Sequence, residues 1–373
     1  SALSRASQNI LRWAGAWEAI SAHASPYAEM VVWDAGSSPQ ASDALRFSAA
    51  EAGEPDLGCI VENLRVQWAL LDSPRLRNVT QLSCGLDGLE LDAAAARLTL
   101  SDGRRLTCRL LAGADGGPSP TRELAGINRS GWLYDQTAVV AHLRTERPHL
   151  ETAWQRFLPT GPIAFLPLAD GRVSVVWSTT PEEAESLQAC DEAEFSRRVS
   201  EASDHVLGRA TLDSRRAAFP LSLWQSNEYV RAHLALVGDA AHTIHPMAGQ
   251  GVNLGFLDAA SLTDVLASAV DAGEDPSGLR VLRRYERWRR SENSLVMGVT
   301  DGMKRLFGAR DMSVAGLRRA GLSLVASQPA LRRTLARRAL GLSGDIRRSS
   351  IRRVNGGPIG DKYNRNALDS ATN

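Results

Sequence analysis

One segment, residues 234–260 (LALVGDAAHTIHPMAGQGVNLGFLDAA), constrains the fold more than any other part of the chain. It opens with a short apolar run typical of a buried strand, passes through a glycine-rich stretch, and ends in a pattern that predicts a helix over about 252–270. Asp239 follows the strand directly, and open α/β sheets bind ligands where their strands end. The segment therefore predicts an α/β fold with a ligand site at this strand end.

The residue types in this segment suit a cofactor. A carboxylate at Asp239 can accept hydrogen bonds from sugar-like hydroxyls. Gly249 and Gly251 let the backbone approach a flat or charged ligand closely. The free N–H groups at the start of the following helix favour an anionic or electron-rich group.

Three other side chains of the segment have simpler interpretations. Asp258 is expected at the surface or as a capping residue. His242 and His245 stand three positions apart, but no third ligand lies nearby in the sequence, so no metal site is predicted.

Composition excludes several classes of protein. A length of 373 residues suggests two domains or one large one. With 43 basic and 42 acidic residues, the net charge of +1 gives no reason to expect nucleic-acid binding. The four cysteines form no CxxC pair, which favours reduced thiols in a cytosolic protein over zinc or redox motifs. No apolar run approaches the ~18–20 residues that a membrane span needs.

Hydrophobic periodicity and turn signals give a coarse secondary structure. Four short β-like runs between residues 136 and 178 predict an antiparallel sheet. The sequence TTPEE predicts a helix that begins at Pro181 and is capped by Thr180. The remaining expectations are helices over 2–22, 62–71, 278–307 and 313–341, strands at 29–34 and 234–237, a hairpin at Asp102-Gly103, and a flexible tail over 354–373.

Two motifs carry a family resemblance. HPMAGQGVNLGFLDA (245–259) resembles the signature of the ubiquinone-biosynthesis hydroxylases, which are FAD-dependent aromatic monooxygenases. DGGPSPTR (115–122) is similar to the second motif of that family. The branch that hydroxylates C5 of 2-polyprenylphenols is the most similar, and the resemblance covers about residues 1–345. Shorter matches are GCIVEN (58–63), IAFLPLAD (163–170), VVWSTTPEEA (175–184) and LRRYERWRR (282–290).

The resemblance implies an α/β, p-hydroxybenzoate-hydroxylase-like fold. It places a discontinuous FAD-binding domain over 1–25, 59–127 and 226–300. An antiparallel-sheet substrate domain takes 26–58 and 128–225. A C-terminal helical region (301–345) and a flexible tail (346–373) follow.

The resemblance also implies a set of site residues. Gly238 and Asp239 would bind the ribityl and diphosphate part of FAD, and the Pro246 carbonyl would contact the substrate hydroxyl, with His245 as a candidate base. Aromatic candidates for the substrate pocket are Trp132, Tyr134, Phe165, Trp177 and Trp224. Further cofactor-binding positions are Gly249, Gln250, Gly251, Val252 and Asn253 near the flavin's pyrimidine edge, Asp115, Gly116 and Arg122 of the second motif, and Asn63.

The reaction implied is hydroxylation of a polyprenylphenol-type ubiquinone precursor. NAD(P)H reduces the FAD, O2 forms a flavin C4a-hydroperoxide, and its terminal oxygen passes to the phenol ring. The expected location is cytoplasmic. Residues 316–353 contain ten arginines and one acid. They suggest either a solvated basic face or a surface that meets the inner face of a membrane or a ubiquinone-biosynthesis complex.

One departure from the family pattern leaves two interpretations. The family opens with a strand–GxGxxG–helix unit that holds the FAD pyrophosphate, and this sequence contains no such unit. The chain is then either a hydroxylase given without its first segment, or an impaired homologue with a structural or complex-assembly role. A flavin halogenase is not favoured, because no WxWxIP motif is present.

Overall fold

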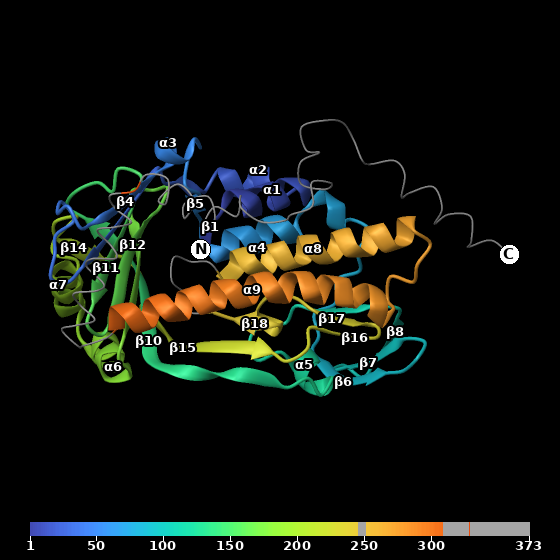
Figure 1. Cartoon of the computed structure of the whole chain (residues 1–373). Coiled ribbons are helices and arrows are strands. Elements are labelled where there is room, and N and C mark those ends of the chain that lie inside the picture. Colours follow the sequence, from blue (N-terminus) through green and yellow to red (C-terminus); the bar gives the residue numbers. More distant parts are fainter. Residues whose placement is uncertain (245–250, 309–327, 329–373) are drawn as a thin grey trace.

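The computed structural model describes residues 1–244, 251–308 and 328. Within these residues the largest sheet has nine strands, in the order β18-β15-β10-β13-β12-β11-β3-β4, with β14 paired to β10 (Figure 1). Its strands are β3 (Glu29–Asp34), β4 (Leu45–Ser48), β10 (Arg129–Thr145), β11 (Thr152–Leu158), β12 (Gly161–Pro167), β13 (Val173–Thr179), β14 (Ala210–Leu212), β15 (Ala217–Ser226) and β18 (His242–Thr243).

The centre of this sheet is the expected antiparallel arrangement. β10, β13, β12 and β11 pair antiparallel in that order, and they contain the four β-like runs predicted from the sequence. β3 then joins β11 in parallel, from a distant part of the chain. The strand 29–34 is therefore confirmed, and the structure adds its place in the sheet.

The two faces of this sheet differ in what covers them. Helices α6 (Pro181–Ala189) and α7 (Glu192–Ala202) cover one face, where they form a core with residues such as Ile163, Val175 and Trp177. Neighbouring residues along β12 and β13 alternate between buried and partly accessible. Because strand side chains alternate between faces, the accessible residues share the opposite face. We call this the open face; it comprises Val140, Ala164, Leu166, Ser174 and Val176.

A second group of elements adjoins the large sheet. It contains three three-stranded sheets: β1-β5-β2, β16-β17-β9 and β6-β7-β8. Their strands are β1 (Ala2–Leu3), β2 (Ser25–Pro26), β5 (Cys59–Ile60), β6 (Leu86–Leu91), β7 (Ala96–Leu100), β8 (Arg105–Cys108), β9 (Leu111–Gly113), β16 (Val230–Arg231) and β17 (Leu234–Leu236). The hairpin predicted at Asp102-Gly103 is the β7–β8 turn, so it is confirmed.

Helices pack against these small sheets. The two longest, α8 (Gly251–Asp271) and α9 (Leu279–Gly308), lie side by side, and α9 continues to the large sheet, where it contacts β11 and β12 (Figure 1). Leu262 of α8 and Leu282 and Tyr285 of α9 join β17 in one buried core. The remaining helices are α1 (Arg5–Trp13), α2 (Trp17–Ser21), α3 (Ala49–Ala52), α4 (Asn63–Leu71) and α5 (Pro120–Leu124), with the 3-10 turns η1 (Pro74–Leu76) and η2 (Gly238–Ala240).

Most of the other predicted elements are confirmed, with one correction. The helix expected over 2–22 is instead the short strand β1 followed by α1 and α2. Ser4 caps α1, and Gly15 separates the two helices with a φ of +75°, a conformation that favours glycine. The strand at 234–237 and the helices over 62–71, 252–270 and 278–307 match β17, α4, α8 and α9 within two residues. Thr180 caps α6 as expected. The helix expected over 313–341 and the tail over 346–373 fall outside the described residues, apart from Gln328.

Candidate functional site

The turn after β17 is built around Gly238. This residue has a φ of +62°, and a Cβ added there would lie 3.5 Å from the Cα of Gly255 in α8. The glycine pair lets the first turns of α8 approach the strand end closely. The strand end and the start of the helix therefore meet at one point, as the strand–loop–helix pattern predicts.

Asp239, the next residue, is exposed to solvent. The surrounding protein nevertheless desolvates its carboxylate enough to raise its pKa above the ordinary value, an effect to which Asp258 adds and which His242 opposes. The carboxylate is therefore accessible to a ligand, although the protein around it partly desolvates it.

Beneath the turn lies a buried polar cluster that sequence reasoning missed. Asp258 of α8 is fully buried, so its expected place at the surface is wrong. One of its carboxylate oxygens accepts the backbone N–H of Gly238 at 3.0 Å and lies 2.6 Å from Nε2 of His242. The other accepts Nε of Arg289 at 2.7 Å and the side-chain amide of Asn293 at 3.2 Å.

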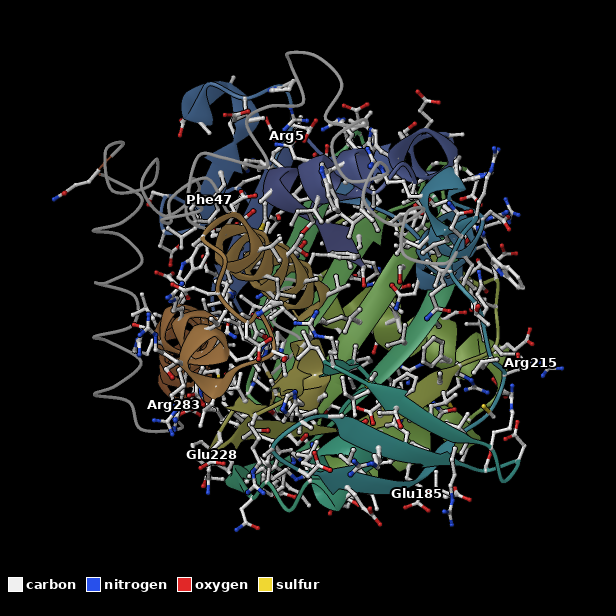
Figure 2. All side chains as sticks on the ribbon, turned by 90° about the vertical axis from the view of Figure 1, so that its right-hand side faces the viewer. Arg5, Phe47, Glu185, Arg215, Glu228 and Arg283 are labelled. Atoms are coloured by element: carbon white, nitrogen blue, oxygen red, sulfur yellow. The ribbon has the colours of Figure 1, made fainter. Side chains whose placement is uncertain are left out.

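These four partners stabilise the carboxylate inside the protein. Burial alone would raise the pKa of Asp258, but the hydrogen bonds and charges of His242 and Arg289 outweigh it and hold the pKa below its usual value. Two arginines of α9 differ in how far they are exposed to solvent. Arg283 points outward from the helix (Figure 2), whereas Arg289 is 4% exposed. His242 is thus a structural partner of Asp258, and no group of three or more metal-ligating side chains occurs in the described part of the chain.

A signal for this cluster is present in the sequence of α9. Leu282, Tyr285, Arg289, Asn293 and Met297 follow helical spacing, and all are buried. Polar residues on an apolar helix face need buried partners. That rule identifies Arg289 and Asn293 as members of an internal cluster.

The start of α8 is anchored to the N-terminal segment through Asn253. Its side-chain oxygen accepts the backbone N–H of Ser4 at 2.9 Å and the hydroxyl of Ser7 at 2.7 Å. Its side-chain nitrogen donates to the carbonyl of Ala2 at 2.8 Å. Because these bonds occupy both side-chain atoms, Asn253 would meet a cofactor through its backbone.

The second motif folds into a loop held by its own polar residues. Asp115 accepts the hydroxyl of Ser119 at 2.6 Å and the backbone N–H of Thr121 at 2.8 Å. Buried Arg122 donates to the carbonyls of Gly117 at 2.9 Å, Pro118 at 3.0 Å and Ala240 at 3.4 Å. Arg122 therefore ties this loop to the turn that carries Asp239.

The other predicted site residues lie as follows. Gly116 lies in the same loop with a φ of +84°, and a Cβ added there would have no atom within 4 Å. Asn63 is the exposed first residue of α4. Gly251 begins α8, and partly buried Val252 packs on the core around Leu11. His245, Pro246, Gly249 and Gln250 fall outside the described residues.

The aromatic candidates for a substrate pocket separate into two groups. Phe165 and Trp177 lie in the core beneath α6 and α7, so the alternation of the strands turns them away from the open face. Tyr134 lies in a cluster with Ile244, Leu254 and Met297, on the side of the sheet that meets α8 and α9. Trp132 packs edge-to-face on Tyr134, and Trp224 lies under the guanidinium of Arg129.

Comparison with known proteins identifies the family. The model of a family described as "FAD binding domain" matches residues 2–297. The ubiquinone hydroxylase UbiL of Rhodospirillum rubrum is 37% identical over 91% of this chain and 79% of its own length. The 3-demethoxyubiquinol 3-hydroxylase of Escherichia coli is 35% identical over 92% of this chain and 87% of its own length.

A solved structure supports the fold. Klebsiella pneumoniae HpxO, complexed with FAD and uric acid, superposes with a TM-score of 0.73 at 17% identity, covering 92% of this chain and 87% of that chain. The expected α/β fold of the p-hydroxybenzoate-hydroxylase type is therefore confirmed.

The residues of this turn suit the cofactor of this family. The Gly238–Gly255 contact brings the start of α8 against the strand end, and Asp239 presents an accessible carboxylate beside it. Family membership shows that FAD is the cofactor. The chain belongs to the ubiquinone-biosynthesis branch of the FAD-dependent aromatic-ring monooxygenases.

Proposed function

We propose that this chain hydroxylates the aromatic ring of a polyprenylphenol-type ubiquinone precursor, with FAD as cofactor and NAD(P)H and O2 as co-substrates. The observation that carries the proposal is the position of the open face. Ala138 and Val176, which share this side of the sheet, pack in one cluster with Leu254 in the first turn of α8. An apolar, partly accessible surface thus adjoins the turn at Gly238 and Asp239, where we place the cofactor.

The chemistry of that surface suits a lipophilic ring. Val140, Ala164, Leu166 and Val176 offer apolar contact, and ligand pockets are mainly apolar with a few placed polar groups. Burial of a prenylated ring against such side chains is favourable by roughly 25 cal/mol per Å2 of apolar surface removed from water. The names of the two ubiquinone relatives agree with a substrate of this kind.

In this proposal the two groups of elements have different roles, one in binding the cofactor and one in binding the substrate. Residues 1–25, 59–127 and 226–300 form the cofactor-binding part, and 26–58 with 128–225 form the substrate part. FAD, when bound, supplies the activation of O2 with reducing equivalents from NAD(P)H. Asp239 accepts hydrogen bonds from the cofactor's ribityl hydroxyls, and Asp115, Gly116 and Arg122 hold the adjoining loop.

Further roles complete the proposed site. Gly249, Gln250, Gly251, Val252 and Asn253 line the flavin's pyrimidine edge, and Asn63 touches the ring system. The carbonyl of Pro246 orients the substrate hydroxyl, and His245 is the candidate base. Contact with a membrane surface or a ubiquinone-biosynthesis complex through residues 316–353 is part of the same proposal. Of the helices that the structure describes, none has the length and apolar character to cross a membrane.

Two measurements test the proposal. The purified chain is incubated with excess FAD, desalted, and examined for flavin absorption bands near roughly 375 and 450 nm, since the protein only tunes the cofactor's spectrum. The loaded protein is then given NADPH or NADH with 2-prenylphenol, and the hydroxylated product is identified by mass spectrometry. We expect both bands and a product heavier by one oxygen atom.

Asp239→Ala provides the site-specific variant and Asp271→Ala, at the exposed end of α8, the control. We expect the first to lose bound FAD and the second to keep it. A colourless wild-type chain would instead favour the structural or complex-assembly role. A flavin-loaded chain that never hydroxylates the phenol would overturn the substrate assignment.

A further inference from the structure

The open face carries a buried amide at its edge. Gln155 of β11 pairs directly with Ala164 of β12, which in turn pairs with Val176 of β13. Residues that face each other across a ladder point to the same side of the sheet. Gln155 therefore belongs to the same side as Ala164 and Val176, about 10 Å from Val176 because two strand spacings separate them.

The surroundings of Gln155 are apolar. On its other side it pairs with Val32 of β3, and Phe157, two positions along β11, packs with Val32 and Leu45. Gln155 is 6% exposed, which places it between this closed cluster and the accessible residues of the open face. In the row of paired residues Val32, Gln155, Ala164 and Val176, it is the residue that carries an amide.

The Gln155 amide makes no hydrogen bond to another residue that the structure describes. Its polar atoms are not among the fully sealed atoms without a partner, so they keep some contact with solvent. An amide without a protein partner, on the same side of the sheet as Ala164 and Val176, is a candidate for binding a polar atom of the ligand.

We infer that Gln155 is a specificity-determining residue that binds a ring oxygen of the aromatic substrate. The inference rests on the proposed function and adds the residue that recognises the ring. The amide donates through its nitrogen to a phenol or quinone oxygen, or accepts a phenol O–H through its oxygen. The apolar residues beside it hold the ring carbons and the prenyl chain, so the amide selects oxygenated rings over plain hydrocarbons.

A pair of ligands isolates this hydrogen bond. 2-Prenylphenol and prenylbenzene differ by one hydroxyl, and their binding to the FAD-loaded protein is measured by isothermal titration calorimetry. Gln155→Met keeps nearly the same shape but removes both polar atoms. We expect Q155M to weaken phenol binding about 5- to 10-fold, the loss of one neutral hydrogen bond, and to leave prenylbenzene binding unchanged.

Two further variants test whether the effect is specific to the amide of Gln155. Gln188→Met makes the same change on α6, beyond the opposite face of the sheet, and should alter neither affinity. Gln155→Asn keeps the amide but draws it back by one methylene group. It should also weaken phenol binding alone, and it serves if Q155M fails to fold.

The outcomes separate the two proposals. If wild-type protein binds neither ligand, the proposed substrate class is wrong, and the role of Gln155 is wrong with it. If the wild type prefers the phenol and both Gln155 variants keep that preference in full, the substrate class stands and Gln155 is not its determinant. If the wild type binds both ligands equally, the ring oxygen is not recognised and the inference about Gln155 is again wrong.

Discussion

The backbone N–H of Gly238 donates to the carboxylate of Asp258, 20 positions away, at 3.0 Å. The bond joins the turn after β17 to the interior of α8. The same carboxylate holds Arg289 of α9, so one side chain connects the turn with both long helices. The conformation of the turn thus depends on a residue that lies beneath it rather than in it.

Asp258→Asn should therefore unfold more easily and bind FAD more weakly. The substitution leaves Arg289 buried without its carboxylate, and breaking a buried ion pair costs about 3–5 kcal/mol. Urea unfolding at pH 7 gives the free energy, and a titration of FAD fluorescence gives the affinity.

The matched control is Asp271→Asn, the same change at the exposed end of α8. It should alter the free energy of unfolding by no more than about 0.5 kcal/mol. Equal effects of the two substitutions would show that the Asp258 cluster contributes nothing specific.

The same carboxylate predicts a pH dependence. The folded-state pKa of Asp258 lies below its ordinary value. Its contribution to stability is then complete above the unfolded-state pKa of about 4 and is lost as pH falls through the folded-state value. Unfolding free energies of the wild type and Asp258→Asn, measured between pH 7 and pH 3, should converge toward the acid end. A constant difference across that range would contradict the depressed pKa.

Arg122→Lys should destabilise the loop of the second motif. Three backbone carbonyls accept from the guanidinium of Arg122, which is 2% exposed. A lysine ammonium cannot reproduce this planar set of donors. We expect a loss of roughly 2 kcal/mol, the value of a hydrogen bond to a charged group. Arg105→Lys, on exposed β8, is the control and should leave the urea midpoint unchanged.

Cys59 should resist alkylation in the folded protein. It is 3% exposed, and burial, with a further contribution from Asp56, raises the pKa of its thiol to about 12. The reactive thiolate is therefore scarce at pH 8. Iodoacetamide followed by peptide mass mapping should show partly exposed Cys84 modified and Cys59 intact, and both modified in urea. Rapid labelling of native Cys59 would contradict this.

The raised pKa of Cys59 also has a consequence for stability at alkaline pH. The unfolded thiol ionises near pH 8.5, whereas the folded one stays protonated to about pH 12. The stability that depends on the neutral thiol is present below the unfolded value and is lost as pH rises toward the folded value. Cys59→Ala should therefore reduce the fall in unfolding free energy between pH 8 and pH 10.

Apolar runs and hydrophobic periodicity predicted the strands and helices that depend on residues close together in the sequence. The strand Glu29–Asp34 and the helix Asn63–Leu71 follow from apolar runs and periodicity, and both are confirmed. The strand end that presents Asp239 follows from the same reasoning. By contrast, the parallel pairing of β3 with β11 depends on contacts more than 120 residues apart, which no local pattern contains.

Asp258 and Trp177 show why parts of the site could not be predicted. A carboxylate in a helix is usually solvated, and the partner that buries Asp258 lies 31 positions away on another helix. Trp177 lies with Val173 and Val175 on the face covered by α6 and α7, whereas Ser174, Val176 and Ser178 of β13 share the other face. Alternation along the strand separates these two faces, but it does not say which of them meets the substrate and which is covered by helices.

The alternation along β12 and β13 gives stability and selectivity to different residues. Substitutions at Ile163, Phe165 or Val175 disturb the core beneath α6 and α7. Their neighbours Ala164, Leu166 and Val176 can change size or polarity while that core stays intact. If the open face binds the substrate as proposed, substitutions at every second position can alter substrate selection while the core beneath α6 and α7 keeps its packing.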